Sequence, residues 1–494
     1  MGEMNALIVG AGISGLTCAI SLARHQGVRV TVLEKAPTLC QVGNGIQVPC
    51  NAAHVLKSLG LLERFSAIAG GPSPGSWSMD YRTGKVLLKR DFGPCERLYG
   101  VPLVHRQDYM NLLLEEAIRL GVDIKTGCDV QEVNLEATSI TLANGQVYTA
   151  DVIIGCDGVH SSIRAALHPN IQVHTSSMIA YRCVLTIPQL AAASSSLRNL
   201  LTAPMCRMWL GPRSHAVVYP LRQGTMLNLV LIINDDPFNK RCRHGDRLRL
   251  LREWVKDWDP VVKEIVDLTP SLDSFPLREL PELPTWSKGS VAIAGDAAHP
   301  TTPFLAQGAA MAVEDAHILG TMLGQLSQRE PRNWKKHIPA ILRSYTDLQR
   351  SRTTRIVRNS RKHGAWDHML PGKERDARDR EFANFDMETC VSECPWIDAR
   401  MNRELLGRRA GDLGERELGR LLAAEAEETK RIQQKPQRGS WFKNWSRRLL
   451  KNSPLLNNRG LGVAFHAGLF MACLTLCGIL ARPDNIPRFE IFNH

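Results

Sequence analysis

The chain has 494 residues, a formal net charge of +12 and 44% hydrophobic residues. This is the composition of a globular protein, and the length exceeds one ordinary core, so we expect two closely joined domains with additional elements. The 13 cysteines lack the spacing of a zinc site or a disulfide framework, which excludes both as the basis of the fold. Four lie in apolar stretches and are expected to be buried thiols in a reducing compartment: Cys18, Cys156, Cys183 and Cys473.

The first predicted element is a buried strand at residues 6–9, which leads into a glycine-rich turn. Gly10, Gly12 and Gly15 have the G-x-G-x-x-G spacing of dinucleotide-binding proteins. In that pattern the first glycine allows a tight turn, the second lets the backbone approach a pyrophosphate, and the third lets the next helix pack on the sheet. A helix is predicted at about residues 15–25, with its N-terminus directed at the phosphates.

A second strand, predicted at residues 28–33, ends at Glu34, which is 19 positions after Gly15. A carboxylate at this place accepts hydrogen bonds from a ribose and argues against a 2′-phosphate. Strand, glycines, helix, strand and acid in this order indicate a Rossmann-like domain of the α/β class. A chance glycine-rich turn is the weaker alternative.

Residues 1–170 are predicted to form the first part of this domain. At residues 35–100 we expect mainly helix and loop, with Gly45 and Gln47 in a loop that precedes a helix. A later helix begins next to Arg106, and another apolar strand ends in a turn that contains Asp157.

Residues 171–280 are rich in β-forming segments such as AYRCVLTI and MLNLVLIIN, which predict a sheet inserted into the nucleotide-binding domain as a substrate-binding domain. The first domain resumes at residues 281–365. There the apolar strand from Val291 runs into Asp296 and then into a helix. A dinucleotide site built from two ends of so long a chain is typical of FAD. Residues 366–440 are predicted to be a helical C-terminal region.

The C-terminal segment predicts a membrane span. Residues 461–481 form an uncharged run of 21 residues, which is long enough to cross a hydrocarbon core as a helix, although its glycines make a buried globular helix an alternative. Nine basic residues and no acidic ones lie in residues 430–459, where Trp441 and Trp445 suit an interfacial belt. The uncharged run predicts a single-pass protein, and the positive charge before it predicts that the catalytic part lies in the cytosol. A nucleic-acid-binding arm is the weaker alternative, and no nucleic acid partner is expected.

The chain resembles the class A flavoprotein aromatic hydroxylases, which are single-component FAD monooxygenases. The resemblance covers about residues 4–380 and rests on three motifs: GAGISG with Glu34, GCDGVHSSIR, and GDAAHPTTPFLAQGAAMAVEDA. Further segments, among them HRQDYM, AYRCVL and YPLRQG, are similar to the branch of salicylate and 3-hydroxybenzoate hydroxylases and to fungal biosynthetic members of that branch.

The resemblance implies a role for several residues toward a non-covalent FAD. Glu34 would bind the adenosine ribose, Arg106 would contact the FAD near its phosphates and ribityl chain, and Asp296 would bind the ribityl hydroxyls. Asp157 is linked in this family to the use of both FAD and NAD(P)H.

Two further segments are implied to contact the cofactor. Gly45 and Gln47 would lie in a loop that closes over it. The helix start at Gly308 and Ala309 would face the flavin pyrimidine, where backbone N–H groups stabilise the negative charge of reduced flavin.

The implied reaction consumes NAD(P)H and O2 and hydroxylates a phenolic or aromatic acid, or a polyketide-type ring, through a C4a-hydroperoxyflavin. The implied catalytic residues are Arg182 and Tyr219, which would pair with a substrate anion and relay a proton. Some relatives have a histidine at the position of Val218. His215 is a possible substitute but fits an ordinary surface or hydrogen-bonded histidine better, and Gln307 would bind a substrate hydroxyl or hold its loop. No metal ligands are expected.

Two alternatives stay open from the sequence. The membrane segment suits an epoxidase of a prenylated, apolar substrate, although the AYR and PFLAQGA segments favour a phenol. A membrane-tethered flavoprotein without catalytic activity is the other alternative, and NAD(P)H oxidation stimulated by a phenolic acid would separate it from an enzyme. A flavin-dependent halogenase is disfavoured because its W-x-W-x-I-P motif is absent.

Overall fold

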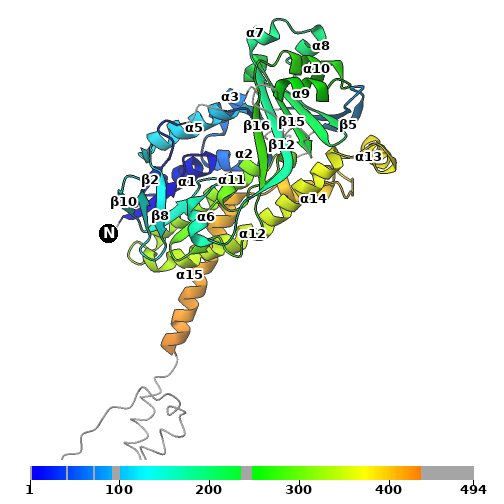
Figure 1. The fold of residues 1–494 in the computed structure, drawn as a ribbon. Helices are drawn as coiled ribbons and strands as arrows, with labels where there is room; N and C mark the ends of the chain where they lie inside the picture. Colours follow the sequence, from blue (N-terminus) through cyan, green and yellow to red (C-terminus); the bar gives the residue numbers. More distant parts are fainter. Residues whose placement is uncertain (1–2, 40–42, 70–72, 92–100, 235–246, 435–494) are drawn as a thin grey trace, which may run out of the picture. The chain divides into compact units, whose positions relative to one another are not determined.

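The computed structural model describes residues 3–39, 43–69, 73–91, 101–234 and 247–434. Residues 1–421 form one compact unit and residues 422–494 a second one. Both sheets of the nucleotide-binding and substrate-binding parts lie in the first unit (Figure 1).

The nucleotide-binding part is built on a six-stranded sheet with the order β17-β18-β11-β1-β2-β7. All neighbouring strands in it are parallel except β17 and β18. Strand β11 is buried along its whole length and β1 along nearly all of it, which is why both are apolar runs in the sequence. The strands are β1 (Met4–Val9), β2 (Val28–Leu33), β7 (Asp123–Lys125), β11 (Val152–Gly155), β17 (Ser287–Lys288) and β18 (Val291–Ile293).

Two helices that are far apart in the sequence pack against each other on this sheet: α1 (Ile13–Ala23) and α11 (Gly308–Arg329). A Cβ on Gly320 of α11 would lie 2.3 Å from the Cβ of Ser21 on α1, so the two backbones approach too closely for a larger residue. This packing brings the glycine-rich turn and the Asp296 motif into one site.

The part predicted to bind the substrate, named the substrate-binding part below, is a seven-stranded sheet with the order β16-β12-β15-β14-β13-β4-β5. The strands are β4 (Gly75–Asp80), β5 (Val86–Asp91), β12 (His174–Leu185), β13 (Cys206–Gly211), β14 (Ser214–Leu221), β15 (Met226–Asn234) and β16 (Asp273–Glu279). Five of these strands lie within the predicted insert at residues 171–280. The prediction missed β4 and β5, which come from the segment for which mainly helix and loop were expected.

One face of the seven-stranded sheet is covered by α9 (Arg247–Trp254) and α10 (Pro260–Asp267), as the upper part of Figure 1 shows. Ala216 and Val218 of β14 belong to the apolar core on this side, together with Leu251 and Ile265 of the helices. The opposite face of the sheet is therefore left to form the wall of the site.

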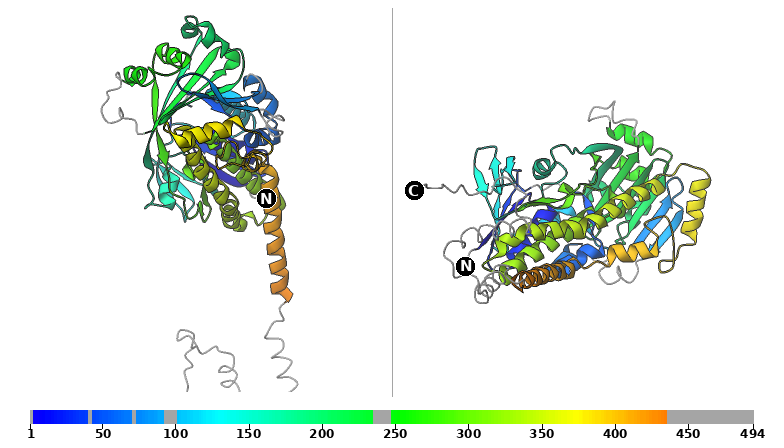
Figure 2. Two further views of the ribbon diagram at one scale, coloured as in Figure 1. Left: turned by 90° about the vertical axis from the view of Figure 1, so that its right-hand side faces the viewer. Right: turned by 90° about the horizontal axis from the view of Figure 1, so that it is seen from below.

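The long helix α12 (Trp334–Asp367) joins the two parts, and Figure 2 shows its length in the view from below. Tyr345 in α12 donates a hydrogen bond of 3.2 Å to the carbonyl of Ile293 in the six-stranded sheet. His368, directly after the helix, contacts His215 of the seven-stranded sheet.

The described residues also form the following helices and short strands. The helices are α2 (Cys50–Ser58), α3 (Leu62–Ala69), α5 (Arg106–Arg119), α6 (Ser162–Leu167), α7 (Ile187–Leu190), α8 (Ser195–Asn199), α13 (Lys373–Ala383), α14 (Ala399–Leu406) and α15 (Ala410–Gln434). The minor strands are β3 (Gly45–Gln47), β6 (Leu103–His105), β8 (Val130–Asn134), β9 (Ser139–Leu142) and β10 (Val147–Thr149). The described part of the predicted C-terminal region, residues 366–434, contains the helices α13, α14 and α15.

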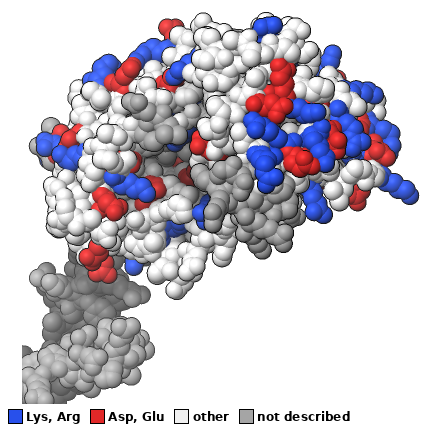
Figure 3. Space-filling model, turned by 45° about the horizontal axis from the view of Figure 1, so that its top comes forward, with Lys and Arg blue, Asp and Glu red and all other residues white. Residues whose placement is uncertain are grey.

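Helix α13 has a surface on which acidic and basic side chains alternate. Arg375 pairs with Asp80 of β4 and with Asp379, and Arg378 pairs with Asp379 at 2.7 Å. Lys and Arg are intermixed with Asp and Glu at the right of the face shown in Figure 3. The charges of this helix thus pair with one another and with the neighbouring strand.

Within the described ranges, no helix combines the length and the apolar character needed to cross a bilayer. The predicted span at residues 461–481 and the preceding Trp441 and Trp445 lie outside the described residues, as does Cys473. The other three cysteines expected to be buried thiols, Cys18, Cys156 and Cys183, are free and buried.

Candidate active site

A cavity of about 390 Å³ is lined by residues of the seven-stranded sheet and by residues of the turns that follow strands β1, β11 and β18 of the six-stranded sheet. The lining includes most of the residues predicted to bind a cofactor: Gly12, Gly45, Gln47, Arg106, Asp296, Gly308 and Ala309. It also includes the two predicted catalytic residues, Arg182 and Tyr219. The structure therefore brings together, in one cavity, residues that lie up to about 300 positions apart in the chain.

The glycine-rich turn has the geometry that its spacing predicts. Gly10 has a φ of +100°, and a Cβ there would lie 2.4 Å from the carbonyl oxygen of Cys156. A Cβ on Gly15 would lie 1.9 Å from the carbonyl oxygen of Gly10, so the turn and helix α1 are in direct backbone contact. A Cβ on Gly12, in contrast, would meet no atom within 4 Å, so this residue leaves open space above the helix N-terminus.

Glu34 lies next to this turn rather than in the cavity lining. Its carboxylate accepts hydrogen bonds from the N–H groups of Ala11, at 2.8 Å, and Ala36, at 2.9 Å. Each carboxylate oxygen can accept a further bond, so the side chain is placed to receive ribose hydroxyls.

The loop with Gly45 and Gln47 becomes strand β3, which lies against the wall of the seven-stranded sheet. The Gly45 N–H donates a bond of 2.8 Å to the side-chain oxygen of Asn228. A Cβ on Gly45 would lie 2.5 Å from the ring of Tyr219, so only glycine lets the loop lie on that ring. The Arg106 N–H, at the start of α5, donates to the carbonyl of Asn44 and thereby closes the other end of the loop.

Asp296 points into the cavity from the turn after β18. Its side chain is accessible from the cavity but enclosed by protein elsewhere, and burial raises the pKa of Asp296 although His299 and Arg106 act in the opposite direction. His299 is fixed by Asp315, whose carboxylate lies 2.5 Å from Nε2 and also accepts a bond from the Gly295 N–H. Burial acts to lower the pKa of His299, but Asp315 outweighs burial and raises it.

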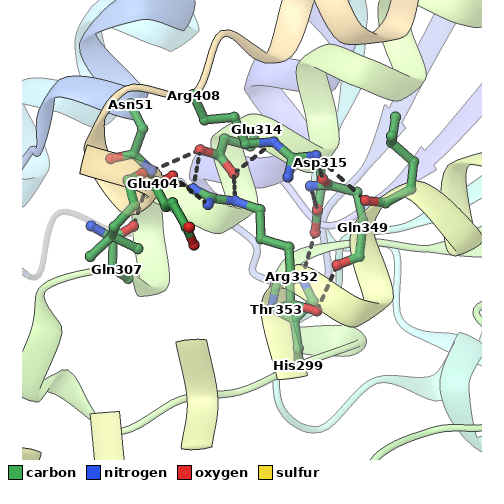
Figure 4. A network of polar contacts seen from close by, with 12 residues as sticks. Asn51, His299, Gln307, Glu314, Asp315, Gln349, Arg352, Thr353, Glu404 and Arg408 are labelled. Atoms are coloured by element: carbon green, nitrogen blue, oxygen red, sulfur yellow. Dashed lines mark hydrogen bonds and ion pairs between the residues drawn. The ribbon is translucent and has the colours of Figure 1, made fainter. Parts of the chain in front are cut away.

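The N-terminus of α11 reaches the cavity through Gly308 and Ala309, and a buried polar network lies behind it (Figure 4). Asn51 of α2 donates to the side-chain oxygen of Gln307, at 3.0 Å, and to Glu314, at 2.8 Å. Arg352 of α12 pairs with Glu314 through two hydrogen bonds of 2.9 Å. Of the two roles predicted for Gln307, these contacts favour holding the loop, and the sequence provided no signal for Asn51, Glu314 or Arg352.

Asp157 does not contribute to the cavity lining, although its neighbours Cys156 and Gly158 do. Its side chain accepts hydrogen bonds from the N–H groups of Ser162, at 2.7 Å, and Ile163, at 3.3 Å, at the start of α6. Burial raises the pKa of Asp157, and these bonds act against that rise. In this structure Asp157 orders the turn, and its predicted link to FAD and NAD(P)H stays a prediction.

The strand register explains why the catalytic candidates share one wall. Side chains alternate between the two faces of a strand, so His215, Val217 and Tyr219 of β14 point the same way, and all three line the cavity. Arg182 pairs with Val230 of β15, which in turn pairs with Val217, so Arg182 belongs to the same face. Val218 points into the opposite core, so a histidine there would not face the cavity.

Arg182 and Tyr219 are buried polar groups in this wall. Burial lowers the pKa of Arg182 and raises that of Tyr219, and each group partly offsets the shift of the other. The Arg182 guanidinium lies 5.4 Å from the centre of the Phe275 ring, and its Nε has no hydrogen-bond partner among the described residues. An arginine keeps its charge even when buried, so this group favours an anion in the cavity.

The residues present fit a flavin dinucleotide. The glycine-rich turn and the N-terminus of α1 offer N–H groups to a pyrophosphate, and Glu34 offers acceptors to a ribose. Asp296 would accept bonds from a polyol chain, and the α11 N-terminus would stabilise negative charge on a flavin ring.

Comparison with known proteins agrees with this fit. Residues 3–360 match a family model described as an FAD binding domain. The FAD-dependent monooxygenase OpS4 of Beauveria bassiana is 31% identical over 412 residues, which are 80% of this chain and 94% of that protein. The chain belongs to the FAD-dependent monooxygenases.

Other members of this family extend the comparison. A 3-hydroxybenzoate 6-hydroxylase of Klebsiella oxytoca is 33% identical over 387 residues, which are 76% of this chain and 91% of that protein. A salicylate hydroxylase in a substrate complex has the same fold, with a TM-score of 0.65 and 24% identity, covering 84% of this chain and 98% of that one. The monooxygenase thus has FAD as its cofactor, and the use of NAD(P)H and O2 is typical of its family.

We expect Asp296→Ala to lose most of its FAD. A buried ribityl hydroxyl left without an acceptor costs about 1–3 kcal/mol, which corresponds to a rise in the FAD dissociation constant of about 5- to 150-fold. Asp296→Asn keeps an acceptor oxygen and is expected to lose less. Flavin absorbance per protein after gel filtration measures both variants, and full occupancy in Asp296→Ala would remove Asp296 from the cofactor site.

Proposed function

We propose that this monooxygenase hydroxylates a phenolic or aromatic acid, or a related polyketide-type ring. The observation that carries the proposal is the position of Arg182, His215 and Tyr219 on one cavity-facing wall. The relatives are consistent with it, because they include a 3-hydroxybenzoate 6-hydroxylase and a 3-amino-4-hydroxybenzoate 2-monooxygenase of Streptomyces platensis.

The wall offers complementary groups to such a ring. The spacing along β14 from His215 to Tyr219 is about 13 Å, at about 3.3 Å per residue, which accommodates one aromatic ring with its substituents. Arg182 would pair with the carboxylate or phenolate. Val217, Val230 and Ile232 lie between the polar groups and supply apolar contact with the ring faces.

FAD, when bound, accepts a hydride from NAD(P)H and activates O2 for transfer of one oxygen atom to the ring. The wall residues hold the ring and control its proton. Because burial raises the pKa of Tyr219, its hydroxyl stays protonated and donates to a substrate oxygen. Burial lowers the pKa of His215 well below its usual value, so its imidazole is neutral. It can accept the phenolic proton, which makes the ring carbon more nucleophilic, only when its second nitrogen releases another proton.

A substrate screen tests the proposed function. The purified protein is mixed with NADH or NADPH and a panel of hydroxybenzoates, salicylates and larger phenols, and cofactor oxidation is followed together with product mass. We expect at least one phenol to stimulate oxidation and to gain one oxygen atom. Stimulation by apolar alkenes alone would favour an epoxidase, and no stimulation at all would favour a flavoprotein without this activity.

We expect Arg182→Ala and Tyr219→Phe to retain FAD but to lose coupling. Neither residue belongs to the glycine-rich turn or the α11 N-terminus, so NAD(P)H should still be consumed, while a misplaced ring diverts oxygen to hydrogen peroxide. Product per NAD(P)H should fall by about tenfold or more, as expected when a positioned group is lost. Val86→Ala, on the distant β5 strand, serves as a control. Unchanged coupling in both variants would assign Arg182 and Tyr219 a structural role.

We further propose that residues 461–481 attach the enzyme to a membrane as a single span, with the catalytic part in the cytosol. The support is the uncharged run itself and the basic residues before it. Removal of residues 435–494 should convert a protein that sediments with membranes into one that stays in the supernatant. Leu469→Arg with Leu474→Arg should have the same effect at full length. A full-length protein that stays in the supernatant without detergent would contradict the proposal.

A further inference from the structure

Two buried histidines connect the wall of the active site to the end of helix α12. His215 Nδ1 and His368 Nε2 lie 2.8 Å apart, although the residues are 153 positions apart in the sequence. His215 lines the cavity and is 3% exposed, whereas His368 follows the last turn of α12 and is 8% exposed. The pair therefore joins the cavity wall to the residue that follows α12.

Both rings are held in place by packing. The Phe304 ring contacts both histidines, with ring centres 5.4 Å from His215 and 5.6 Å from His368. Phe304 can reach this position because Gly364 lies beneath it, where a Cβ would be only 2.5 Å from its ring. The His368 carbonyl also accepts a bond of 3.0 Å from the Arg213 N–H, which attaches the end of α12 to the start of β14.

The hydrogen bonds leave one nitrogen of each ring available. Within the part of the chain that the structure describes, His215 Nε2 and His368 Nδ1 have no hydrogen-bond partner. An imidazole that accepts a proton at one nitrogen can release another from its second nitrogen. The pair thus has a free nitrogen on His215 at the cavity, a hydrogen bond between the two rings, and a second free nitrogen on His368.

We propose that His215 and His368 form a two-imidazole proton relay that carries the substrate's phenolic proton from the cavity to the outside. The relay deepens the proposed function and rests on it, because it requires a phenol in the cavity. His215 is a catalytic residue in this scheme, since it contacts the substrate. His368 acts through His215.

In the relay, each proton that one atom loses is gained by the next atom or by solvent. The phenolic O–H bond breaks and an N–H bond forms at His215 Nε2, while the proton on His215 Nδ1 passes to His368 Nε2. The proton on His368 Nδ1 then leaves to solvent. The substrate becomes a phenolate, both imidazoles end neutral with their tautomers exchanged, and rotation or reverse exchange restores the starting state.

The surroundings favour a concerted transfer over a stored charge. Burial lowers the pKa of His368 to about 4 and that of the neighbouring His363 to about 3. The Asp367 carboxylate lies 3.6 Å from His363, and burial raises the pKa of Asp367 to about 8, with the Arg378 cation acting against the rise. At neutral pH the Asp367 carboxyl is therefore protonated and cannot stabilise a histidinium at His368. The proton must then pass through the histidine pair and cannot remain on it.

The test separates relaying from positioning. His368→Gln keeps a side chain that can hydrogen-bond His215 but cannot pass a proton on. His368→Ala removes the bond and leaves space for free imidazole. His363→Gln is the matched control, because His363 is an equally buried histidine of α12 whose Nδ1 lies 3.5 Å from Cys394 Sγ, away from the cavity.

The oxidised holoenzyme is mixed in a stopped-flow instrument, in weak buffer with a pH indicator, with the phenol that gives product in the screen. We expect proton release to be at least tenfold slower in His368→Gln and His368→Ala. The phenol dissociation constant, read from the flavin spectrum, should change less than threefold. His363→Gln should behave like the wild type, and added imidazole should accelerate release in His368→Ala in proportion to its concentration.

The outcomes are distinguishable. If no phenol in the screen gives product, the proposed function fails, and the relay falls with it. If product forms but His368→Gln releases the proton at the wild-type rate, only the relay is overturned. A slow His368→Ala that binds FAD and phenol normally but does not respond to imidazole would likewise overturn the relay, since His368 would then only orient His215.

Discussion

Gly15→Ala is expected to yield a protein without FAD and with reduced stability. The new Cβ would lie 1.9 Å from the carbonyl oxygen of Gly10, a backbone atom that no rotamer change can move. Gly10 cannot retreat, because its own φ is +100° and it lies against the backbone of Cys156. Overpacking of this kind costs about 1–3 kcal/mol, and the shift opens the turn that would hold the pyrophosphate.

Gly12→Ala is the matched control for this prediction. Its Cβ meets no atom within 4 Å, so the fold and the thermal unfolding of the flavin-free protein should be unchanged. The Cβ would instead occupy space above the helix N-terminus, so FAD affinity should fall. Flavin content and apoprotein melting temperature, measured for both variants, separate the effects. A Gly15→Ala protein with full flavin and wild-type melting temperature would contradict the assignment of this turn.

Arg352→Met is expected to cause the largest loss of stability of any single substitution considered for this protein. Arg352 and Glu314 are 6% and 0% exposed at their side chains, and Arg352 also donates to the carbonyls of Glu404 and Leu405 in the last turn of α14. Removing one partner of a buried ion pair costs about 3–5 kcal/mol, because Glu314 would keep only the more distant Arg408, whose Nε lies 3.9 Å away, as a neighbouring cation. Because Glu314 also accepts a bond from Asn51, which bonds Gln307, FAD affinity should fall as well.

Denaturant unfolding of the holoenzyme measures this loss, with Lys256→Ala as the control. Lys256 pairs with Glu253 at 2.6 Å on the surface, and such an exposed pair contributes little to stability. The double variant Arg352→Met with Glu314→Leu removes both charges and should recover part of the stability. Equal effects of Arg352→Met and Lys256→Ala would mean that the buried network does not support the α11 N-terminus.

The sequence by itself determined the nucleotide-binding half of the protein. Gly10, Gly12, Gly15 and Glu34 act within one strand–turn–helix–strand unit, so their spacing carries the information. The position of Asp296 could be predicted as well, because it directly follows a second apolar strand. Sequence patterns are strong where a function depends on the backbone conformation of a few consecutive residues.

Only some strands of the seven-stranded sheet could be predicted from the sequence. The strands at residues 174–279 have clear β-forming character, whereas β4 and β5 are strands because they pair with β13 and with each other. Residues 75–91 contain few β-branched residues, so their own preference for a strand is weak. Pairing with a distant strand, which no local pattern records, decided their conformation.

The position of the proposed catalytic residues on one cavity wall was decided by tertiary structure. Arg182 and Tyr219 were identified by resemblance, but strand register determines that His215 shares their face and that Val218 does not. His368 acquires its place only because α12 ends beside β14, which unites residues 153 positions apart. Turn conformation is a local property of the chain, whereas a hydrogen bond between distant side chains exists only after two sheets and a long helix have packed together.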